Sequence, residues 1–120
     1  MKPSFLIPTF VAAAAAFALL SASAANAHTR LLKASPAVNA AVGAPKIIHL
    51  EFSERLEPMF SGLDLMKANG ASVAVRSMAA GKVIDAAPKA ALKPGSYMVM
   101  WHVVSADGHK MKGQYNFTVK

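Results

Sequence analysis

The chain has 120 residues, no cysteine and a formal net charge of +7 at neutral pH. Without cysteine it has neither disulfides nor thiol chemistry. Its lysines and arginines are scattered singly and form no run or stripe, which argues against a nucleic-acid-binding surface. We interpret them as solvated surface charge, which at most attracts the protein weakly to anionic membranes.

The first 27 residues have the pattern of a secretory signal peptide. Lys2 provides a positive charge, residues 5–20 are almost entirely apolar, and the small residues that follow end in Ala25-Asn26-Ala27. The apolar run is short for a membrane span of about 20 residues, so we favour cleavage over an uncleaved membrane anchor. Cleavage after Ala27 would deliver residues 28–120 to the periplasm as one domain that begins with His28.

The rest of the chain is typical of short strands separated by turns. Apolar residues alternate with polar ones over residues 47–52, 63–66, 72–76, 97–103 and 114–119, which predicts strands with one buried face. Asn69-Gly70 is a strong signal for a hairpin turn, and Lys93-Pro94-Gly95 marks another turn. Residues 77–89 are rich in alanine and have room for at most one helical turn, because Gly81 and Pro88 interrupt them.

Six or seven such strands, with no convincing amphipathic helix, predict an all-β fold in which antiparallel sheets form a small sandwich or barrel. Trp101 belongs to the strand with the clearest inward face, so we expect it to be the central residue of the core. His49 falls on the polar face of its strand and is expected to be solvated.

His28 becomes an unusual residue if the signal peptide is removed after Ala27. A free α-amine and the imidazole of the same residue can chelate one metal ion, and the amine loses its proton easily because its pKa is about 7.7–8.0. Copper(II) favours such nitrogen ligands in a tetragonal plane. These two donors do not occur together in the precursor, so the site would form only after export.

A second group of possible ligands lies at Asp107-Gly108-His109. Residues two apart in an extended chain point to one side, so this carboxylate and this imidazole can converge, and Gly108 gives the backbone freedom to adjust them. On its own such a pair is more often a loop aspartate beside a solvated histidine. Together with the amine and imidazole of His28, it would complete the equatorial plane of one copper(II) ion.

At these residues the sequence resembles the CopC family of periplasmic copper-binding proteins. The resemblance covers essentially the whole chain after position 27. The segment that carries it most specifically is Val104-Ser105-x-Asp107-Gly108-His109-x-x-x-Gly113. Three others occur in family order, namely Leu31-Leu32-Lys33-Ala34-Ser35-Pro36, Leu50-Glu51-Phe52-Ser53-Glu54, and Leu92-Lys93-Pro94-Gly95-Ser96-Tyr97 followed by Val99 and Trp101.

The resemblance implies a small Greek-key β-sandwich or barrel of about seven strands, immunoglobulin-like or cupredoxin-like in appearance. It also implies that one copper(II) ion is bound by the N-terminal amine, His28, Asp107 and His109. Glu54 occupies an acidic position that lies near the copper in the family, which implies an outer or weak axial role. The alternative for Glu54 is a salt bridge with a lysine or arginine.

Some family members also carry a methionine-rich loop that binds copper(I), because soft thioethers select that ion. The corresponding region here, residues 66–78, has methionine only at its two ends and no histidine, which argues against that site. Met98, Met100 and His102 share the outer face of one strand. They form either a copper(I) patch or an ordinary sheet face, and we favour the second because methionine commonly fills gaps.

The resemblance implies a monomeric, non-catalytic carrier or buffer that serves copper homeostasis or resistance and hands copper to a CopD-like importer in the inner membrane. The alternative is a copper-dependent oxidase or monooxygenase, because lytic polysaccharide monooxygenases also use an N-terminal histidine chelate. Those enzymes have a larger sandwich with a flat aromatic surface, and Asp107 in the copper plane would block the position that oxygen needs. A structural or adhesion sandwich without metal is the third interpretation.

Overall fold

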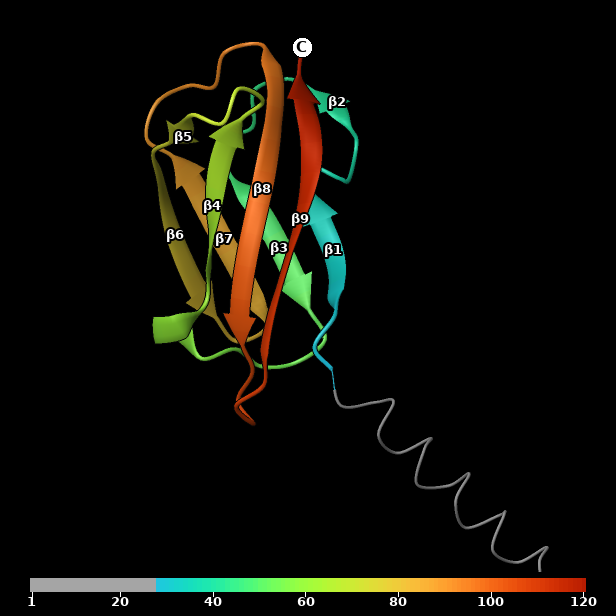
Figure 1. Ribbon diagram of the computed structural model, residues 1–120, viewed down its shortest axis with the longest axis vertical. Coiled ribbons are helices and arrows are strands. Elements are labelled where there is room, and N and C mark those ends of the chain that lie inside the picture. The colour runs from blue at the N-terminus through green and yellow to red at the C-terminus, as the bar shows by residue number, and fades with distance from the viewer. Residues whose placement is uncertain (1–27) are drawn as a thin grey trace, which may run out of the picture.

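The computed structural model describes residues 28–120, so the predicted signal peptide lies outside the described residues. Two β-sheets pack face to face (Figure 1). The four-stranded sheet has the order β1 (Leu31–Ser35), β3 (Ile48–Phe52), β7 (Val83–Pro88) and β6 (Val75–Ala80). The five-stranded sheet has the order β2 (Ala41–Val42), β9 (Lys110–Val119), β8 (Gly95–Val104), β4 (Gly62–Lys67) and β5 (Ser72–Val73).

The connections between the sheets confirm the predicted sandwich. β3 pairs with β7 and β4 pairs with β8, so the chain repeatedly crosses from one sheet to the other, as in a Greek key. The parallel pairing of the two-residue strand β2 with β9 differs from the purely antiparallel sheets that were expected. Within residues 28–120 the only helical turn is η1 (Pro58–Phe60), and no helix there is long and apolar enough to cross a membrane.

Residues 77–89 form strands, so the helical turn that their alanine content suggested is wrong. β6 and β7 make an antiparallel hairpin, with Gly81 in the left-handed conformation at φ 59° in the turn. Ile84 and Ala86 on β7 are completely buried against the facing sheet. Alanine is weakly disfavoured in strands, but packing between two sheets overrides this tendency, and a small side chain suits this closely packed position.

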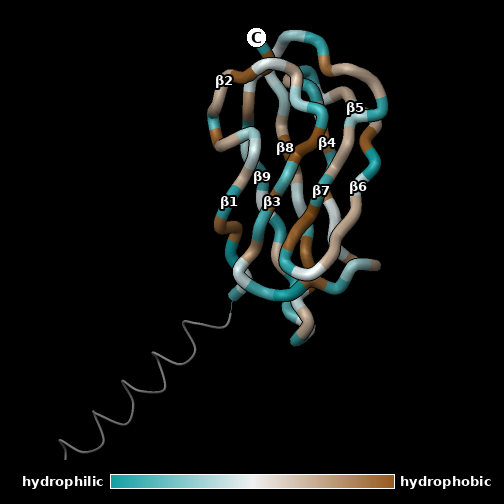
Figure 2. The backbone as a smooth tube through the Cα atoms, turned by 180° about the vertical axis from the view of Figure 1, so that it is seen from behind, coloured by the Kyte–Doolittle hydropathy of each residue, from teal (hydrophilic) through white to brown (hydrophobic). Residues whose placement is uncertain are grey.

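The core lies between the two sheets and is formed by the alternate, inward-facing residues of their strands. Its largest fully buried side chains are Phe52, Phe117, Ile48, Leu50, Leu65, Ile84, Val99 and Val103. In Figure 2 the brown, hydrophobic segments fall mainly on the strands, and teal predominates in the turns at the lower end. Trp101 is only half-buried, so the prediction that it is the central residue of the core is wrong.

Trp101 packs at the margin of this core. Its ring meets Phe52 edge-on, with the ring centroids 5.1 Å apart, and it covers Gly113, its partner on β9. A Cβ atom at position 113 would lie 2.7 Å from Trp101 Cε2 and still closer to Cζ2. Gly113 therefore has no side chain because the indole ring occupies that space.

We predict that Gly113→Ala destabilises the protein by about 1–3 kcal/mol, because the new methyl group forces the Trp101 ring out of its position against Phe52. Chemical denaturation measures this free energy of unfolding. Gly43→Ala is the matched control, since a Cβ at Gly43 would have no neighbour within 4 Å. Equal stability of the two variants would contradict the packing described here.

His49 lies on the polar face of β3, as predicted, but it is not simply solvated. Its Nδ1 lies 2.5 Å from Asp85 Oδ1 on β7, and its Nε2 lies 3.0 Å from Glu51 Oε2. The hydrogen bond with Glu51, followed by that with Asp85, raises the pKa of His49, and the bond with His49 lowers the pKa of Glu51. When it is protonated, the imidazole thus bridges two carboxylates on adjacent strands.

This bridge predicts a specific pH dependence of stability. A raised pKa in the folded state means that the contribution of His49 is fully present below its ordinary pKa of about 6.5 and is lost as pH rises through the folded value. The difference in unfolding free energy between the wild type and His49→Gln should therefore shrink above about pH 6.5. Urea denaturation across a pH series with chelator present measures it.

Asp85→Asn should reduce the same pH dependence, because it removes one of the two carboxylates that hold His49 charged. Asp64→Asn, a substitution on the other sheet that leaves both partners of His49 in place, is the control. An identical pH profile in wild type and His49→Gln would show that the bridge contributes nothing to stability.

Candidate metal centre

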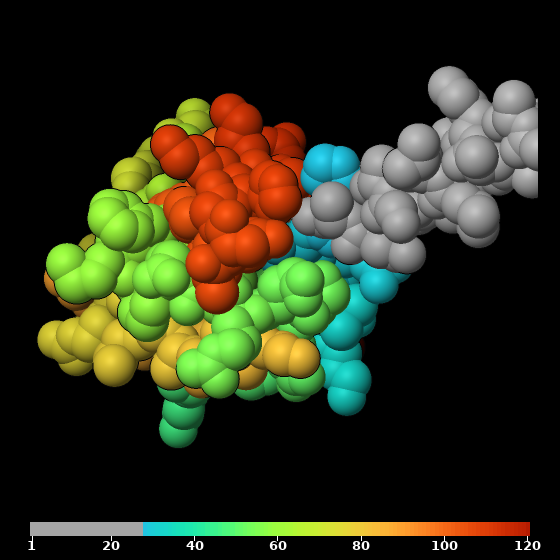
Figure 3. Space-filling model, turned by 90° about the horizontal axis from the view of Figure 1, so that it is seen from below, coloured from blue at the N-terminus to red at the C-terminus, as the bar shows by residue number. Residues whose placement is uncertain are grey.

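The candidate ligands gather at one end of the sandwich, at the lower end in Figure 1. Three segments distant in the sequence meet there: residues 28–30 before β1, residues 53–57 after β3, and the tip of the β8–β9 hairpin at residues 105–109. Figure 3 looks onto this end and shows the orange hairpin tip beside the first described residues in blue. The fold therefore brings the first residues of the domain next to the hairpin that joins its last two strands.

The hairpin tip is a closed turn, which corrects the expectation that Asp107 and His109 lie on extended chain. Ser105 and His109 close it, because the Ser105 amide donates to the His109 carbonyl at 2.9 Å. Gly108 has φ 94°, a conformation that favours glycine, and its amide donates to the Ser105 carbonyl at 2.8 Å. The Ala106 amide donates to the carbonyl of Arg55 at 2.9 Å and so fixes the tip to the segment after β3.

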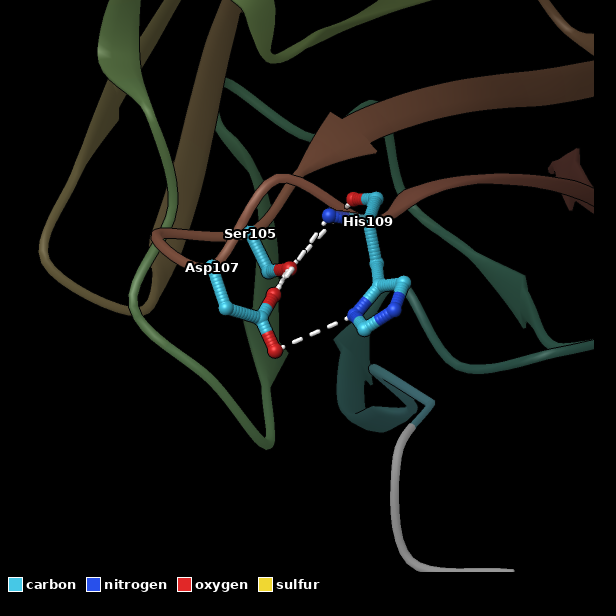
Figure 4. Close-up of polar contacts among 3 residues, drawn as sticks. All are labelled: Ser105, Asp107 and His109. Carbon is cyan, nitrogen blue, oxygen red and sulfur yellow. Dashed lines mark hydrogen bonds and ion pairs between the residues drawn. The ribbon is translucent and has the colours of Figure 1, made fainter. Parts of the chain in front are cut away.

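The turn holds Asp107 and His109 in direct contact (Figure 4). His109 Nδ1 lies 3.0 Å from Asp107 Oδ2, and the buried hydroxyl of Ser105 donates to Asp107 Oδ1. The hydroxyl, followed by the backbone amide of His109, lowers the pKa of Asp107. The carboxylate is thus kept ionised, and both side chains are more than half exposed, at 58% for Asp107 and 51% for His109.

His28 lies beside this pair. Its ring centroid is 6.5 Å from that of His109, with the ring planes inclined at 55°. The chain is held there because the amide of Arg30 donates to Ser53 Oγ at 2.8 Å, while its carbonyl accepts from the Ser53 amide at 2.9 Å. Thr29, between His28 and Arg30, is 2% exposed and anchors this segment in the domain.

Glu54 is exposed and lines a shallow hollow with Arg55, Ser105, Ala106 and Asp107. It makes no ion pair in the part of the chain that the structure describes. Its carboxylate remains available on the same side of the molecule as Asp107, which is compatible with an outer role.

The donor types at this end suit a metal ion, although they do not yet form a complete site. Among residues 28–120, no three histidine, aspartate or glutamate side chains are already placed to hold one ion. Two imidazoles bound to one metal at about 2.0 Å each have their centroids about 6 Å apart or closer. The 6.5 Å between the ring centroids of His28 and His109 is slightly more than this separation.

The comparisons with known proteins show the family of this chain. The CopC domain family matches residues 31–120. Copper resistance protein C of Xanthomonas campestris pathovar juglandis is 41% identical over 112 residues, which cover 86% of this chain and 88% of that protein. Protein YobA of Escherichia coli K12 is 43% identical over 99 residues, with coverage of 78% and 80%.

A solved structure has a similar fold. The crystal structure of PcoC, a methionine-rich copper resistance protein from Escherichia coli, matches with a TM-score of 0.72 and 38% identity, over 78% of this chain and all of that one. The chain belongs to the CopC family, a family of copper resistance and copper-binding proteins.

One relative is much longer than this chain. Copper transport protein CutJ of Bacillus subtilis is 30% identical over 98 residues, which make up 78% of this chain but only 18% of CutJ. A domain similar to this one is thus part of a larger copper transport protein in that organism.

The structure adds two serines to the residues that shape the site. Ser53 fixes the segment that carries His28, and Ser105 holds the Asp107 carboxylate. Both lie within the segments that carry the family resemblance, but a serine in a sequence has no signature of its own as a positioning residue. Only the folded geometry shows which donors and acceptors they join.

We predict that Ser105→Ala raises the pKa of Asp107 toward the ordinary aspartate value, because the largest cause of its lowering is removed. A carboxyl ¹³C NMR titration of the metal-free protein measures this change directly. Ser96→Ala, at the opposite end of β8, should leave the Asp107 titration unchanged. An unchanged curve for Ser105→Ala would mean that other groups keep the carboxylate ionised.

Proposed function

We propose that cleavage after Ala27 releases residues 28–120 into the periplasm, where the domain acts as a monomeric carrier or buffer of one copper(II) ion. Membership in a copper resistance family supports the metal, and the signal-peptide pattern of the first 27 residues supports the compartment. The proposed ligands are the new α-amine, the imidazole of His28, Asp107 and His109.

The observation that carries this proposal is the position of His28 next to His109, with ring centroids 6.5 Å apart. Cleavage then creates a strong nitrogen donor at a residue that already lies at the site. An amine and two imidazoles are ligands that copper(II) prefers, and the Asp107 oxygen completes the plane. Because the α-amine must lose its proton on binding, copper affinity should increase with pH.

The Asp107–His109 pair supports the same arrangement. Two ligands at right angles in a copper plane, each about 2.0 Å from the ion, lie about 2.8 Å apart. His109 Nδ1 and Asp107 Oδ2 are 3.0 Å apart in the metal-free geometry. Copper(II) can therefore replace the proton that these two atoms share with little movement of either side chain, while Ser105 keeps hold of Oδ1.

The exposure of the site supports a carrier rather than an enzyme. Asp107 and His109 lie at a hairpin tip where a partner can reach the ion. Four strong donors fill the copper plane, which leaves oxygen no equatorial position. We propose an inner-membrane importer as the recipient, supported by the longer copper transport protein that contains a similar domain.

We predict that an extra alanine before His28 weakens copper(II) binding by more than about 100-fold, because the amine then belongs to another residue. His28→Ala, Asp107→Ala and His109→Ala should each cause losses of the same order. Glu54→Gln should cost about tenfold at most, as expected for an outer group. Competition titration of the exported protein, after mass spectrometry has established its first residue, measures these affinities.

His49→Gln is the matched control, because it removes a histidine outside the site. It should leave copper(II) affinity unchanged. If the extended protein binds copper(II) as tightly as the native one, or if the exported chain does not begin at His28, the proposed coordination is wrong. Ascorbate oxidation by the copper-loaded protein at a rate above that of free copper would instead favour the enzyme.

A further inference from the structure

We propose a second metal site, selective for soft monovalent ions such as copper(I), on the outer face of the five-stranded sheet. Its donors are the thioether sulfurs of Met66, Met98 and Met100. It shares no residue with the hairpin tip, so it stands or falls independently of the copper(II) site.

The strand register places these three methionines together. Met66 on β4 lies directly opposite Met98 on β8, and Met100 follows two residues further along the same face of β8. Side chains opposite one another have Cβ atoms about 4.5–5.5 Å apart, and diagonal neighbours about 7–8 Å apart. Methionine is unbranched and flexible, so three sulfurs at these positions can turn toward one ion between them.

These methionines are not part of the hydrophobic core. Leu65 and Val99, which alternate with them along β4 and β8, are completely buried and point to the opposite face of the sheet. Figure 1 views the outer face, with β8 and β4 in front. Met66 and Met98 are nevertheless only half-exposed, as expected if they lie flat and pack on each other across the strands.

The donor type, rather than the local charge, favours a soft cation at the three methionines. Asp64 lies opposite Met100 on β4 and is negative, Lys112 on β9 lines the same hollow and is positive, and Asn116 and Gln114, the β9 partners of Met98 and Met100, are neutral. Neutral, polarisable thioethers select copper(I) over harder ions. The face therefore combines soft donors with side chains of opposite charge that offset each other.

His102 does not belong to this donor set, which changes the patch that the sequence suggested. It lies four residues from Met98 on β8, about 13 Å away along the strand and too far for both to hold one ion. Its ring lies over β4 at Gly62, where a Cβ atom would be 3.6 Å from His102 Nε2. Met66, which is distant in sequence, takes its place as the third donor.

Silver(I) is a redox-inert probe of this site. In the exported protein labelled with ¹³C at the methionine methyl groups, one equivalent of silver(I) should shift the signals of Met66, Met98 and Met100. The signals of Met59 and Met78, which are 88% and 68% exposed elsewhere on the surface, should not move. Equal shifts of all exposed methionines would mean non-specific thioether binding and would overturn the proposal.

A competition titration with bicinchoninate and copper(I), without oxygen, tests the donors. Replacing Met66, Met98 and Met100 together by leucine keeps the side-chain volume and should weaken copper(I) binding at least about tenfold, as for the loss of essential metal ligands. The double variant Met59→Leu/Met78→Leu is the matched control. Met100→Leu alone, at the most exposed of the three donors, should also weaken binding if the triple variant folds poorly.

The same titration with His109→Ala separates this site from the hairpin tip. That variant should keep silver(I) and copper(I) binding at the methionines while it loses copper(II). X-ray absorption of the copper(I)-loaded protein should show sulfur neighbours. Nitrogen neighbours only, or undiminished copper(I) binding by the triple leucine variant, would show that the methionines merely cover the sheet.

Discussion

The pairing of β8 with β9 is the constraint on which the core and both proposed metal sites depend. The two strands are paired continuously from Gly95↔Val119 to Val104↔Lys110. Because successive side chains point to opposite faces, Val99 and Val103 enter the core while Met98 and Met100 face outward. A shift of one residue would exchange the two faces along the whole strand. The burial of the inward set therefore also determines which residues can meet a metal.

The same pairing fixes the hairpin tip, but the candidate copper(II) site needs a second constraint, on the segment before the first strand. His28 precedes β1, and its position depends on the hydrogen bonds between Arg30 and Ser53 at the end of β3. An ion bound by His28 and His109 would join the first strand to the last hairpin. Such binding stabilises the folded state by an amount that grows with the logarithm of the affinity, because the unfolded chain cannot assemble the same ligands.

The fold was largely predictable from the sequence because alternation along β3, β4, β8 and β9 is clear and the turns carry glycine or proline. The strands within residues 77–89 were not predictable, because alanine is weakly disfavoured in strands and only packing between the sheets makes this segment extended. Trp101 was misjudged because size alone does not show that its partner Gly113 places it at the margin of the core. His49 was misjudged because its carboxylate on β7 is 36 residues away in the sequence.

The sequence could propose the residues of the candidate site, but it could not predict how they are arranged. The cleavage pattern pointed to His28 and a family segment to Asp107 and His109, but the turn that joins the last two and the Ser105 bond to the carboxylate come from the fold.

The methionines on the outer face of the five-stranded sheet could likewise be grouped only in part from the sequence. Met98 and Met100 are adjacent in the sequence pattern, whereas Met66 joins them only through the register between β4 and β8. Ligands that are close in sequence can be read from spacing. Ligands that are close only across strands follow from the pairing, and pairing is decided by which face the core buries.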